Sequence, residues 1–398
     1  MALPGVKIKF ENGNFGTVAT NPDGVCGLVS NAVPVSATFL LNKHYVIFSL
    51  KDAENLGIIN SVDNHELYKT IQEFYNEAGN GTELWIYGVA KTRTLDQLVS
   101  DATALLDASN RRISAVVLKY APGTADTAVT AGLRTGFPAT LAAAQAIAET
   151  YTIEKIHPIV FFIEGYNFTG VAQDLVGFEL ANNNRIAVLI GDTETRTGTY
   201  ASKGSCIGIL AGRFAKNQVQ VNIGRVKDGA LKPLEFFIKD VLVEQYNVTT
   251  LHDKGFITLR THVGKSGYYF TDDLMACTVE DDYHYLARRR TIDKAYRLAN
   301  ATLTNYLLDD LNLTDDGKIS PFVAKVIETE IERVIAQEMT ANNELSADIT
   351  KANDTGVQAK IDLNEVIART SKIKGSIKVK PKGYPRYIEF GLGFNINS

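Results

Sequence analysis

The segment Gly264-Lys265-Ser266 resembles the end of a phosphate-binding loop, in which backbone amides and a lysine hold the phosphates of a nucleotide. That loop also needs a glycine five positions before Gly264, where this chain has Leu259. The residues that follow, Gly-Tyr-Tyr-Phe, do not begin a helix, so no helix N-terminus would face a phosphate. We therefore expect no nucleotide binding at Lys265.

Carboxylates and histidines do not form a catalytic or metal-binding pattern either. Asp192 follows the apolar run 186–190 at the end where α/β sheets place ligands, and we interpret it as a loop carboxylate that caps the next element. The acids 280–282 precede a predicted helix, whose positive end attracts negative charge; a metal site is the alternative interpretation. His157 precedes Pro158 at the start of a predicted strand and is interpreted as structural. The histidines as a set are His44, His65, His157, His252, His262 and His284, and none are spaced as in metalloprotease motifs. We expect no catalytic residue, no metal site and no cofactor.

Composition excludes further classes of protein. The chain has 398 residues, of which 45% are hydrophobic and 22% charged, and its net charge of -4 argues against a nucleic-acid binder. The first residues lack the basic start and apolar core of a signal peptide, and the strongest apolar run, 159–163, is too short to span a membrane. The three cysteines are scattered, which indicates a reducing compartment and neither a disulfide framework nor a zinc site. We expect no membrane insertion.

Short apolar runs alternate with amphipathic helical patterns between residues 21 and 245. The runs are 25–29, 45–48, 84–87, 113–118, 159–163 and 186–190. Continuous apolar runs are typical of strands covered by helices on both faces, so this stretch predicts an α/β domain with a largely parallel sheet. Gly204, Gly208 and Gly212 recur every four residues, which predicts a helix that lies close against this sheet.

Residues 246–384 predict a different, α+β unit. A long helix uses apolar residues at helical spacing from Ile292 to Leu307, and a second helix follows Pro321. The inner face of the second helix is predicted to be Val323, Ile327, Ile331 and Val334, and its outer face Lys325, Glu328, Glu332 and Glu338. We expect that outer face to lie near a neighbouring molecule. Strands are predicted around Val366 and over 377–380.

Both chain ends alternate apolar and polar residues with period two, which is typical of half-buried strands. The apolar positions are Val6, Ile8 and Phe10 at the amino terminus, and Ile388, Phe390, Leu392, Phe394 and Ile396 at the carboxyl terminus. An unpaired apolar strand at a chain end promotes association unless something covers it. We therefore divide the chain into an arm (1–20), two domains (21–245 and 246–384) and a second arm (385–398).

Charge is uneven beside the second arm. Residues 371–389 hold six basic residues and one acid, a net of +5, whereas residues 307–367 hold thirteen acids and five bases, a net of -8. Two solvated faces are one interpretation. In the other, Lys378, Lys380 and Lys382 meet an acidic surface on a neighbouring subunit and help to set the register of docking.

Several segments together resemble the contractile tail sheath proteins of bacteriophages and related injection systems. They are Leu3-Pro4-Gly5-Val6, Gly24-Val-Cys-Gly-Leu-Val-Ser-Asn-Ala, Gly204-Ser-Cys-Ile-Gly-Ile-Leu-Ala-Gly-Arg-Phe-Ala, the stretch from Leu251-His-Asp-Lys-Gly-Phe to Arg288-Arg-Arg-Thr-Ile-Asp, and the final strand. The order and span of these matches carry the resemblance, and residues 110–190 match least.

The resemblance implies a structural subunit and no enzyme. Sheath subunits polymerise through terminal arms that add strands to the sheets of their neighbours, and the sleeve contracts to drive an inner tube through a cell envelope. The implied partners are other copies of the chain, the tube protein, and baseplate and tail terminator proteins. The implied location is the virion tail, assembled in the cytoplasm of the bacterial host.

Two other classes stay open at this point. One is an α/β enzyme or small-molecule-binding protein whose terminal strands pair with each other. The other is a generic filament or shell protein. A sheath predicts open-ended polymers, because a heterologous contact that does not close generates helices, whereas an enzyme predicts a compact oligomer.

Overall fold

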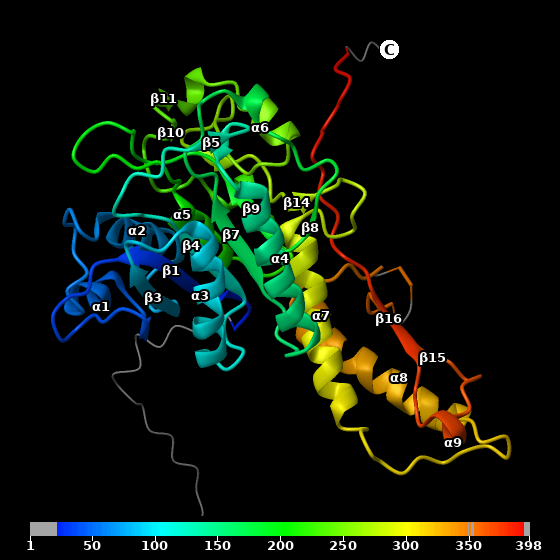
Figure 1. The fold of residues 1–398 in the computed structure, drawn as a ribbon. Helices are drawn as coiled ribbons and strands as arrows, with labels where there is room; N and C mark the ends of the chain where they lie inside the picture. The colour runs from blue at the N-terminus through cyan, green and yellow to red at the C-terminus, as the bar shows by residue number, and fades with distance from the viewer. Residues whose placement is uncertain (1–21, 349, 352–353, 394–398) are drawn as a thin grey trace, which may run out of the picture. The chain divides into compact units, whose positions relative to one another are not determined.

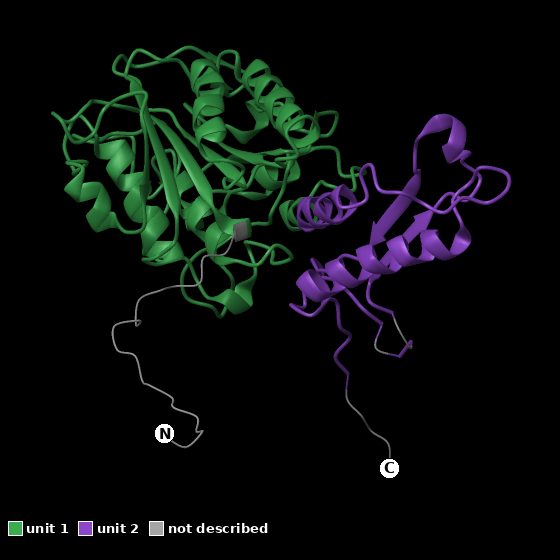
Figure 2. Cartoon of the chain, turned by 90° about the horizontal axis from the view of Figure 1, so that it is seen from below, with its two compact units in different colours: residues 1–290 green, residues 291–398 purple. Residues whose placement is uncertain are grey.

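The computed structural model describes residues 22–348, 350–351 and 354–393, and the chain forms two compact units, residues 1–290 (unit 1) and 291–398 (unit 2) (Figure 2). The amino-terminal positions Val6, Ile8 and Phe10 and the last two apolar positions, Phe394 and Ile396, lie outside the described residues. Each unit is described by itself below.

Unit 1 is built on a six-stranded sheet with the strand order β2-β3-β1-β4-β7-β9 (Figure 1). The strands are β1 (Cys26–Ala32), β2 (His44–Ile47), β3 (Leu84–Ala90), β4 (Ala115–Lys119), β7 (Val160–Glu164) and β9 (Ile186–Leu189). Only the pairing of β2 with β3 is antiparallel in this sheet. The predicted α/β class with a largely parallel sheet is confirmed.

Helices cover both faces of the sheet. They are α1 (Leu50–Asn55), α2 (His65–Ala78), α3 (Leu95–Ala108), α4 (Phe137–Ile153) and α5 (Ile207–Lys216). Helices α3 and α4 pack against each other and against the sheet, and α2 and α5 form a second such pair. Because each strand is buried on both sides, β1, β4, β7 and β9 are buried along their whole length, as their unbroken apolar runs predicted.

Local signals fix where these helices begin. Thr94 accepts a hydrogen bond from the Gln97 backbone N–H, and the Gln97 side chain accepts one from the Thr94 backbone N–H, so α3 begins with a complete capping box. Asn64 is at the N-cap position of α2, and its side chain bonds the backbone of Val33 in the loop after β1 and does not cap the helix.

The glycine-rich helix α5 packs against α2, and this corrects the prediction that its glycines face the sheet. A Cβ atom on Gly208 would lie 2.3 Å from the carbonyl oxygen of Thr70, and one on Gly212 would lie 2.7 Å from that of Phe74. Both contacted atoms belong to the α2 backbone. The glycines therefore allow two helix backbones to approach closely on one face of the sheet.

Replacing Gly208 with alanine is expected to lower the free energy of unfolding by about 1–3 kcal/mol, because an added methyl group forces the α2 backbone to move. In a helix with open space around the glycine, the same change would stabilise the protein by roughly 0.5–1 kcal/mol. The sign of the change in unfolding free energy therefore distinguishes a closely packed glycine from an unobstructed one. Urea denaturation measures the change. Gly383→Ala is the control: nothing lies within 4 Å of its added Cβ, and its effect should stay within about 0.5 kcal/mol.

Shorter elements complete unit 1. Four two-stranded ribbons pair β5 (Val129–Thr130) with β6 (Leu133–Arg134), β8 (Asn182–Asn183) with β14 (Ala276–Cys277), β10 (Phe237–Ile238) with β11 (Val241–Leu242), and β12 (Leu259–Arg260) with β13 (Tyr269–Phe270). Helix α6 spans Thr249–Asp253, and single 3-10 turns lie at Pro22–Gly24, Ala172–Asp174, Val226–Asp228 and Val243–Gln245.

Unit 2 consists of helices and one hairpin. Helix α7 (Leu286–Thr304) leads into it, and α8 (Pro321–Ile335) continues into a π-helical turn at Ala336–Thr340. The hairpin joins β15 (Val357–Ile361) to β16 (Gly375–Val379), with the short helix α9 (Ile367–Thr370) in the connection. The predicted strand around Val366 is wrong, since that residue precedes α9, and β15 was not predicted. No helix in the described part of the chain is both long and apolar enough to cross a membrane.

Candidate functional site

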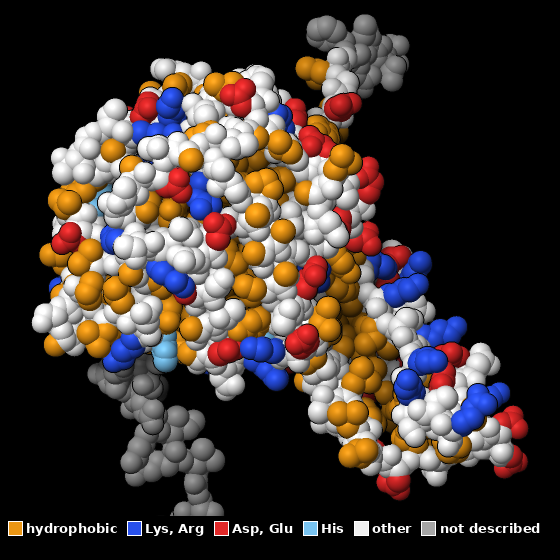
Figure 3. Space-filling view, viewed as in Figure 1, with side chains coloured by type: hydrophobic (Ala, Val, Ile, Leu, Met, Phe, Trp, Pro, Cys, Tyr) orange, Lys and Arg blue, Asp and Glu red, His pale blue; other side chains and the backbone are white. Residues whose placement is uncertain are grey.

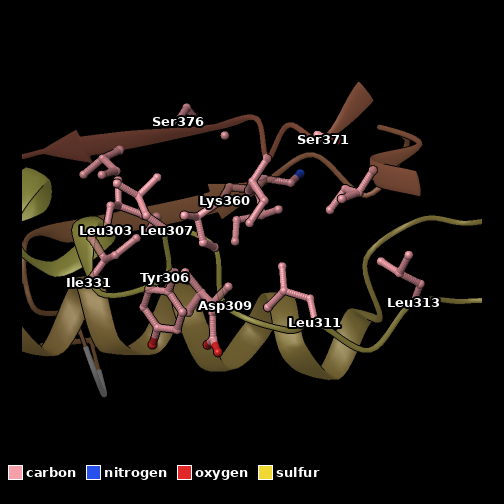
Figure 4. Close-up of a pocket in the computed structure, with 18 of the residues that line it drawn as sticks. Leu303, Tyr306, Leu307, Asp309, Leu311, Leu313, Ile331, Lys360, Ser371 and Ser376 are labelled. Atoms are coloured by element: carbon pink, nitrogen blue, oxygen red, sulfur yellow. The ribbon is translucent and has the colours of Figure 1, made fainter. Parts of the chain in front are cut away.

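Unit 2 contains an apolar groove with a volume of about 860 Å³ (Figure 4). Its walls are the chain that follows α7, the inner face of α8, and the hairpin. The apolar lining residues are Leu303, Leu307, Leu308, Leu311, Leu313, Ile327, Ile331, Ala359, Ile361, Ile367, Ile373 and Ile377. Leu307 and Leu308 are 73% and 105% exposed, so the groove presents apolar surface to whatever surrounds unit 2. Figure 3 shows hydrophobic side chains over this part of unit 2 and basic side chains along the hairpin beside it.

The hairpin above the groove is a sheet of two strands. In β15, Val357, Ala359 and Ile361 are buried, and Gln358 and Lys360 point the other way. The backbone N–H of Asp362 bonds the carbonyl of Lys374, and that of Lys380 bonds the carbonyl of Gly356. Backbone N–H groups alternate in direction along an antiparallel strand, so the odd-numbered residues of both strands turn their N–H groups to the outer edges.

Helix α8 occupies the outer edge of β15. The backbone N–H groups of Ala359 and Ile361 donate to the carboxylates of Glu332 and Glu328, over 2.9 and 2.8 Å. This contradicts the expectation that Glu328 and Glu332 belong to a free outer face of α8. A β15 edge filled by side chains cannot accept a strand. The outer edge of β16, toward which Ile377 and Val379 direct their N–H groups, has no strand neighbour among the described residues.

The carboxyl-terminal arm does not form a strand in its described part. Residues 387–393 have no strand neighbour among the described residues, and Ile388, Phe390 and Leu392 are 71%, 90% and 102% exposed. Figure 2 shows this segment leaving unit 2 as extended chain. The prediction that the arm pairs with another molecule stays a prediction.

The three lysines of the predicted docking segment differ in their contacts. Lys378 lies in β16 and pairs with Gln358. Lys380 forms an ion pair with Asp354 over 2.6 Å, and the Lys382 ammonium donates to Asn343 over 2.7 Å. The bond from Lys380 lowers the pKa of Asp354 to about 2. Two of the three therefore have partners within unit 2, and the structure leaves Lys378 as the most available for an outside contact.

A buried ion-pair network fills the carboxyl end of the sheet in unit 1, where an α/β enzyme would bind its substrate. Lys119, the last residue of β4, lies 2.7 Å from Glu164 at the end of β7 and 2.8 Å from Glu66 in α2. One turn along α2, Lys69 lies 2.5 Å from Asp192 and 2.8 Å from Glu73. The predicted capping role of Asp192 is thus wrong in its main part, because its carboxylate chiefly neutralises Lys69.

Burial and pairing shift the titration of these groups in opposite directions. Burial by itself raises the pKa of Glu66, but the ammonium groups of Lys119 and Lys69 lower it to about 2. Burial dominates at Glu164 and raises its pKa, although Lys119 and two backbone N–H groups, of Tyr120 and Ser205, bond its carboxylate. Burial would lower the pKa of Lys119, but the carboxylates of Glu164 and Glu66 raise it, so the lysine stays charged.

The network leaves little room for a substrate. The cavity beside it, lined by residues including Gly165, Asp192 and Gly204, has a volume of about 10 Å³, roughly that of one water molecule. A Cβ atom on Gly204 would lie 2.3 Å from the Glu164 carboxylate, so even this glycine is closely packed. The enzyme alternative is not supported.

The other residues singled out from sequence occupy structural positions. Lys265 lies in the exposed turn between β12 and β13 and is followed by a strand, as its sequence context predicted. The His157 ring bonds the backbone carbonyl of Ile113 over 2.5 Å in the core. Asp281 accepts hydrogen bonds from Asn184 and from the backbone of Tyr283.

The fold is that of contractile sheath proteins. It matches the helical sheath of the anti-feeding prophage in its contracted state with a TM-score of 0.64 and 16% identity, covering 100% of both chains. The PVC sheath complex of an extracellular contractile injection system matches with a TM-score of 0.55 and 13% identity over 100% of this chain and 98% of that one. A sheath tail protein from Desulfitobacterium hafniense matches with a TM-score of 0.50 and 8% identity, over 95% of this chain and 100% of that one. The sheath fold that the resemblance implied is confirmed.

The chain belongs to the DUF2586 family. Its residues 3–274 match the N-terminal domain of that family and residues 282–398 match the C-terminal domain. No curated protein matches it.

Proposed function

We propose that this chain is the structural subunit of a contractile tail sheath, which polymerises into a helical sleeve around an inner tube and contracts to drive the tube through a cell envelope. The observation that carries the proposal is the combination in unit 2 of three features: a β16 edge without a strand neighbour among the described residues, an apolar groove beneath the hairpin, and an exposed apolar arm. The sheath fold supports it over the full length of the chain.

The arm of one subunit pairs with β16 of a neighbour in this proposal. Residues 385–398 add a strand whose backbone bonds the free N–H groups of Ile377 and Val379. With period-two alternation, Ile388, Phe390 and Leu392 then turn together toward the apolar groove, while Glu389 faces away. Residues 1–12 of a further neighbour extend the same sheet. Lys378 contributes to register through charge.

The partners follow from this role. The chain contacts copies of itself, the tube protein that it encloses, and the baseplate and tail terminator proteins at the two ends of the sleeve. The anti-feeding prophage structures to which it is similar include a baseplate as well as a sheath. We place the protein in a phage-type tail that is assembled in the cytoplasm of the bacterial host, without nucleic acid, cofactor or catalytic turnover.

Electron microscopy of purified Val379→Pro protein tests this role. Proline removes the outward N–H of β16 without breaking a bond to β15, and its ring blocks an incoming strand. Wild-type protein is expected to form helical tubes. We expect the proline variant to lose about 1 kcal/mol or more of association free energy at each contact between subunits. Its critical concentration for assembly should therefore rise at least about fivefold.

Val379→Ala is the matched control, because it trims the same side chain but keeps the N–H. It should assemble within about twofold of wild type, and circular dichroism should show all three proteins folded. Normal tubes from folded Val379→Pro protein would show that β16 is not the acceptor edge. Discrete closed oligomers from the wild type would argue against a sheath.

A further inference from the structure

Three potential metal ligands meet at the rim of the ion-pair network in unit 1. His65 and Glu66 are in the first turn of α2, and Glu194 is in the loop after β9. One ligand atom from each lies within 4.8 Å of the others. The His65 side chain is 9% exposed and that of Glu194 33%, so the group is partly enclosed but can be reached from solvent.

The histidine is oriented as metal ligands are. Its Nδ1 lies 2.7 Å from the side-chain oxygen of Asn60, and its ring stacks on Tyr200 with centroids 4.1 Å apart. A proton held on Nδ1 by the amide oxygen leaves the Nε2 lone pair exposed, and ligating histidines are fixed by this kind of outer bond.

The Nε2 lone pair then faces a carboxylate. Both Glu194 oxygens are close to it, at 2.9 and 3.0 Å, where a single N–H donor would align with one of them. In this tautomer a lone pair and a carboxylate repel each other unless a metal cation or a proton on Nε2 lies between them. For an ion about 2.1 Å from each atom, these separations correspond to ligand–metal–ligand angles of about 90°, which match octahedral coordination and are smaller than the tetrahedral angles of structural zinc sites.

Charge in the network also favours a cation. The carboxylates of Glu66, Glu73, Glu164, Asp192 and Glu194 number five, against the two ammonium groups of Lys69 and Lys119. If Arg196, which interacts with Asp192, and Lys91, which interacts with Glu66, are added to the cations, the carboxylates still exceed them by one. Two carboxylate oxygens of the network, Oδ2 of Asp192 and Oε2 of Glu73, have no hydrogen-bond partner among the described residues. A cation at the rim would offset this negative charge.

We propose that His65, Glu66 and Glu194 bind one divalent transition-metal ion, which ties the loop after β9 to the start of α2. Glu66 already accepts bonds at Oε2 from Lys119 and Ser202, so Oε1 is the oxygen assigned to the ion. One imidazole nitrogen with two carboxylates suits Zn²⁺ or Mn²⁺, whereas Ca²⁺ and Mg²⁺ prefer ligand sets made of oxygen alone. The role is structural and independent of the sheath proposal.

Metal-dependent thermal unfolding of the EDTA-treated full chain tests the site. Zn²⁺, and more weakly Mn²⁺, should raise Tm in a saturable way, Ca²⁺ and Mg²⁺ should not, and native mass spectrometry should find one Zn²⁺ per chain. His65→Gln and Glu194→Gln should each weaken the apparent affinity at least tenfold. His252→Gln is the control, since His252 also lies beside a carboxylate, that of Asp253 at 3.5 Å, but belongs to no group of three metal ligands among the described residues. This variant should bind Zn²⁺ as wild type does.

Three results would overturn the proposal. The first is that metal causes no saturable rise in the Tm of the wild type, and the second is that metal raises Tm equally in all variants. The third is that His65 stabilises the protein only in acid and without metal, which would indicate a simple imidazolium–carboxylate pair. Glu194 is in a loop and partly exposed, so Glu194→Gln carries the test if His65→Gln does not fold.

Discussion

Replacing Lys119 with methionine is expected to lower the free energy of unfolding by about 3–5 kcal/mol, because it leaves the carboxylates of Glu164 and Glu66 buried without their counter-charge. Methionine has a similar length and keeps the packing, so the loss of charge is isolated. Lys119 has no exposed side-chain surface, and both of its partners lie within 2.8 Å, so water cannot replace the ammonium group. Urea denaturation at pH 7 measures the loss.

The loss should shrink in acid. In the wild type the folded-state pKa of Glu66, about 2, is below its ordinary 4.5, so its pairing stabilises the protein above pH 4.5 and this contribution fades toward pH 2. In the variant, the two orphaned carboxylates take up protons more readily when folded, so the variant is relatively less stable at higher pH. The difference between the two proteins should therefore be largest near neutral pH and should begin to decrease above pH 4.5, where the variant's carboxylates start to take up protons.

Lys155→Met is the matched control for this prediction. Lys155 lies 2.5 Å from Asp107, but the two side chains are 44% and 59% exposed, so the change should cost only about 0–1 kcal/mol. Equal losses of unfolding free energy in Lys119→Met and Lys155→Met would show that the buried network stabilises the protein no more than a surface ion pair does.

Removing the apolar face of the carboxyl-terminal arm is expected to abolish assembly while leaving the subunit folded. The change is Ile388→Ser, Phe390→Ser and Leu392→Ser together. These side chains are 71%, 90% and 102% exposed in the single chain, so they contribute little to its own stability. Burying each against a neighbour is worth about 1.5–3 kcal/mol, and the triple change should raise the critical concentration by at least about a thousandfold. Sedimentation and electron microscopy measure polymer, and thermal unfolding measures the subunit.

The opposite face of the same arm supplies the control. Tyr387→Ser with Glu389→Ser alters the alternate positions and should leave the critical concentration within about tenfold of wild type. Deletion of residues 385–398 should match the triple variant. Tubes that form normally after deletion would show that the arm does not link subunits.

The sequence predicted the unit 1 sheet because strands buried on both faces appear as unbroken apolar runs. The start of α3 also carries a local signal, since a capping box such as Thr94 with Gln97 depends only on neighbouring residues. By contrast, β15 alternates Val357, Ala359 and Ile361 with polar residues, and this short signal was available but missed. The strand expected around Val366 failed because two adjacent apolar residues there, Val366 and Ile367, do not distinguish a strand from one helical turn.

The ion-pair network could not be predicted from local spacing. Lys119, Glu164 and Asp192 come from three different strand ends, and only the order of strands in the sheet brings them together. Glu66, Lys69, Glu73 and Glu77 share one face of α2, and such charged stripes normally face solvent. The usable signal was that Lys119 and Glu164 each end an entirely apolar strand, where a charge has no access to water.

The two carboxylates of α8 that bond the backbone of β15 give the subunit a direction. Glu328 and Glu332 close one margin of the hairpin, so in the proposed assembly a new strand is received on the other margin only, and the donated strand is a different part of the chain. Donor and acceptor are thus unlike surfaces. Contacts repeated head to tail then give an open polymer, whereas a reciprocal exchange of arms between two subunits would close a dimer. Growth should then be polar, with one end of the polymer carrying empty hairpins and the other carrying unused arms, and each end would need its own terminating protein.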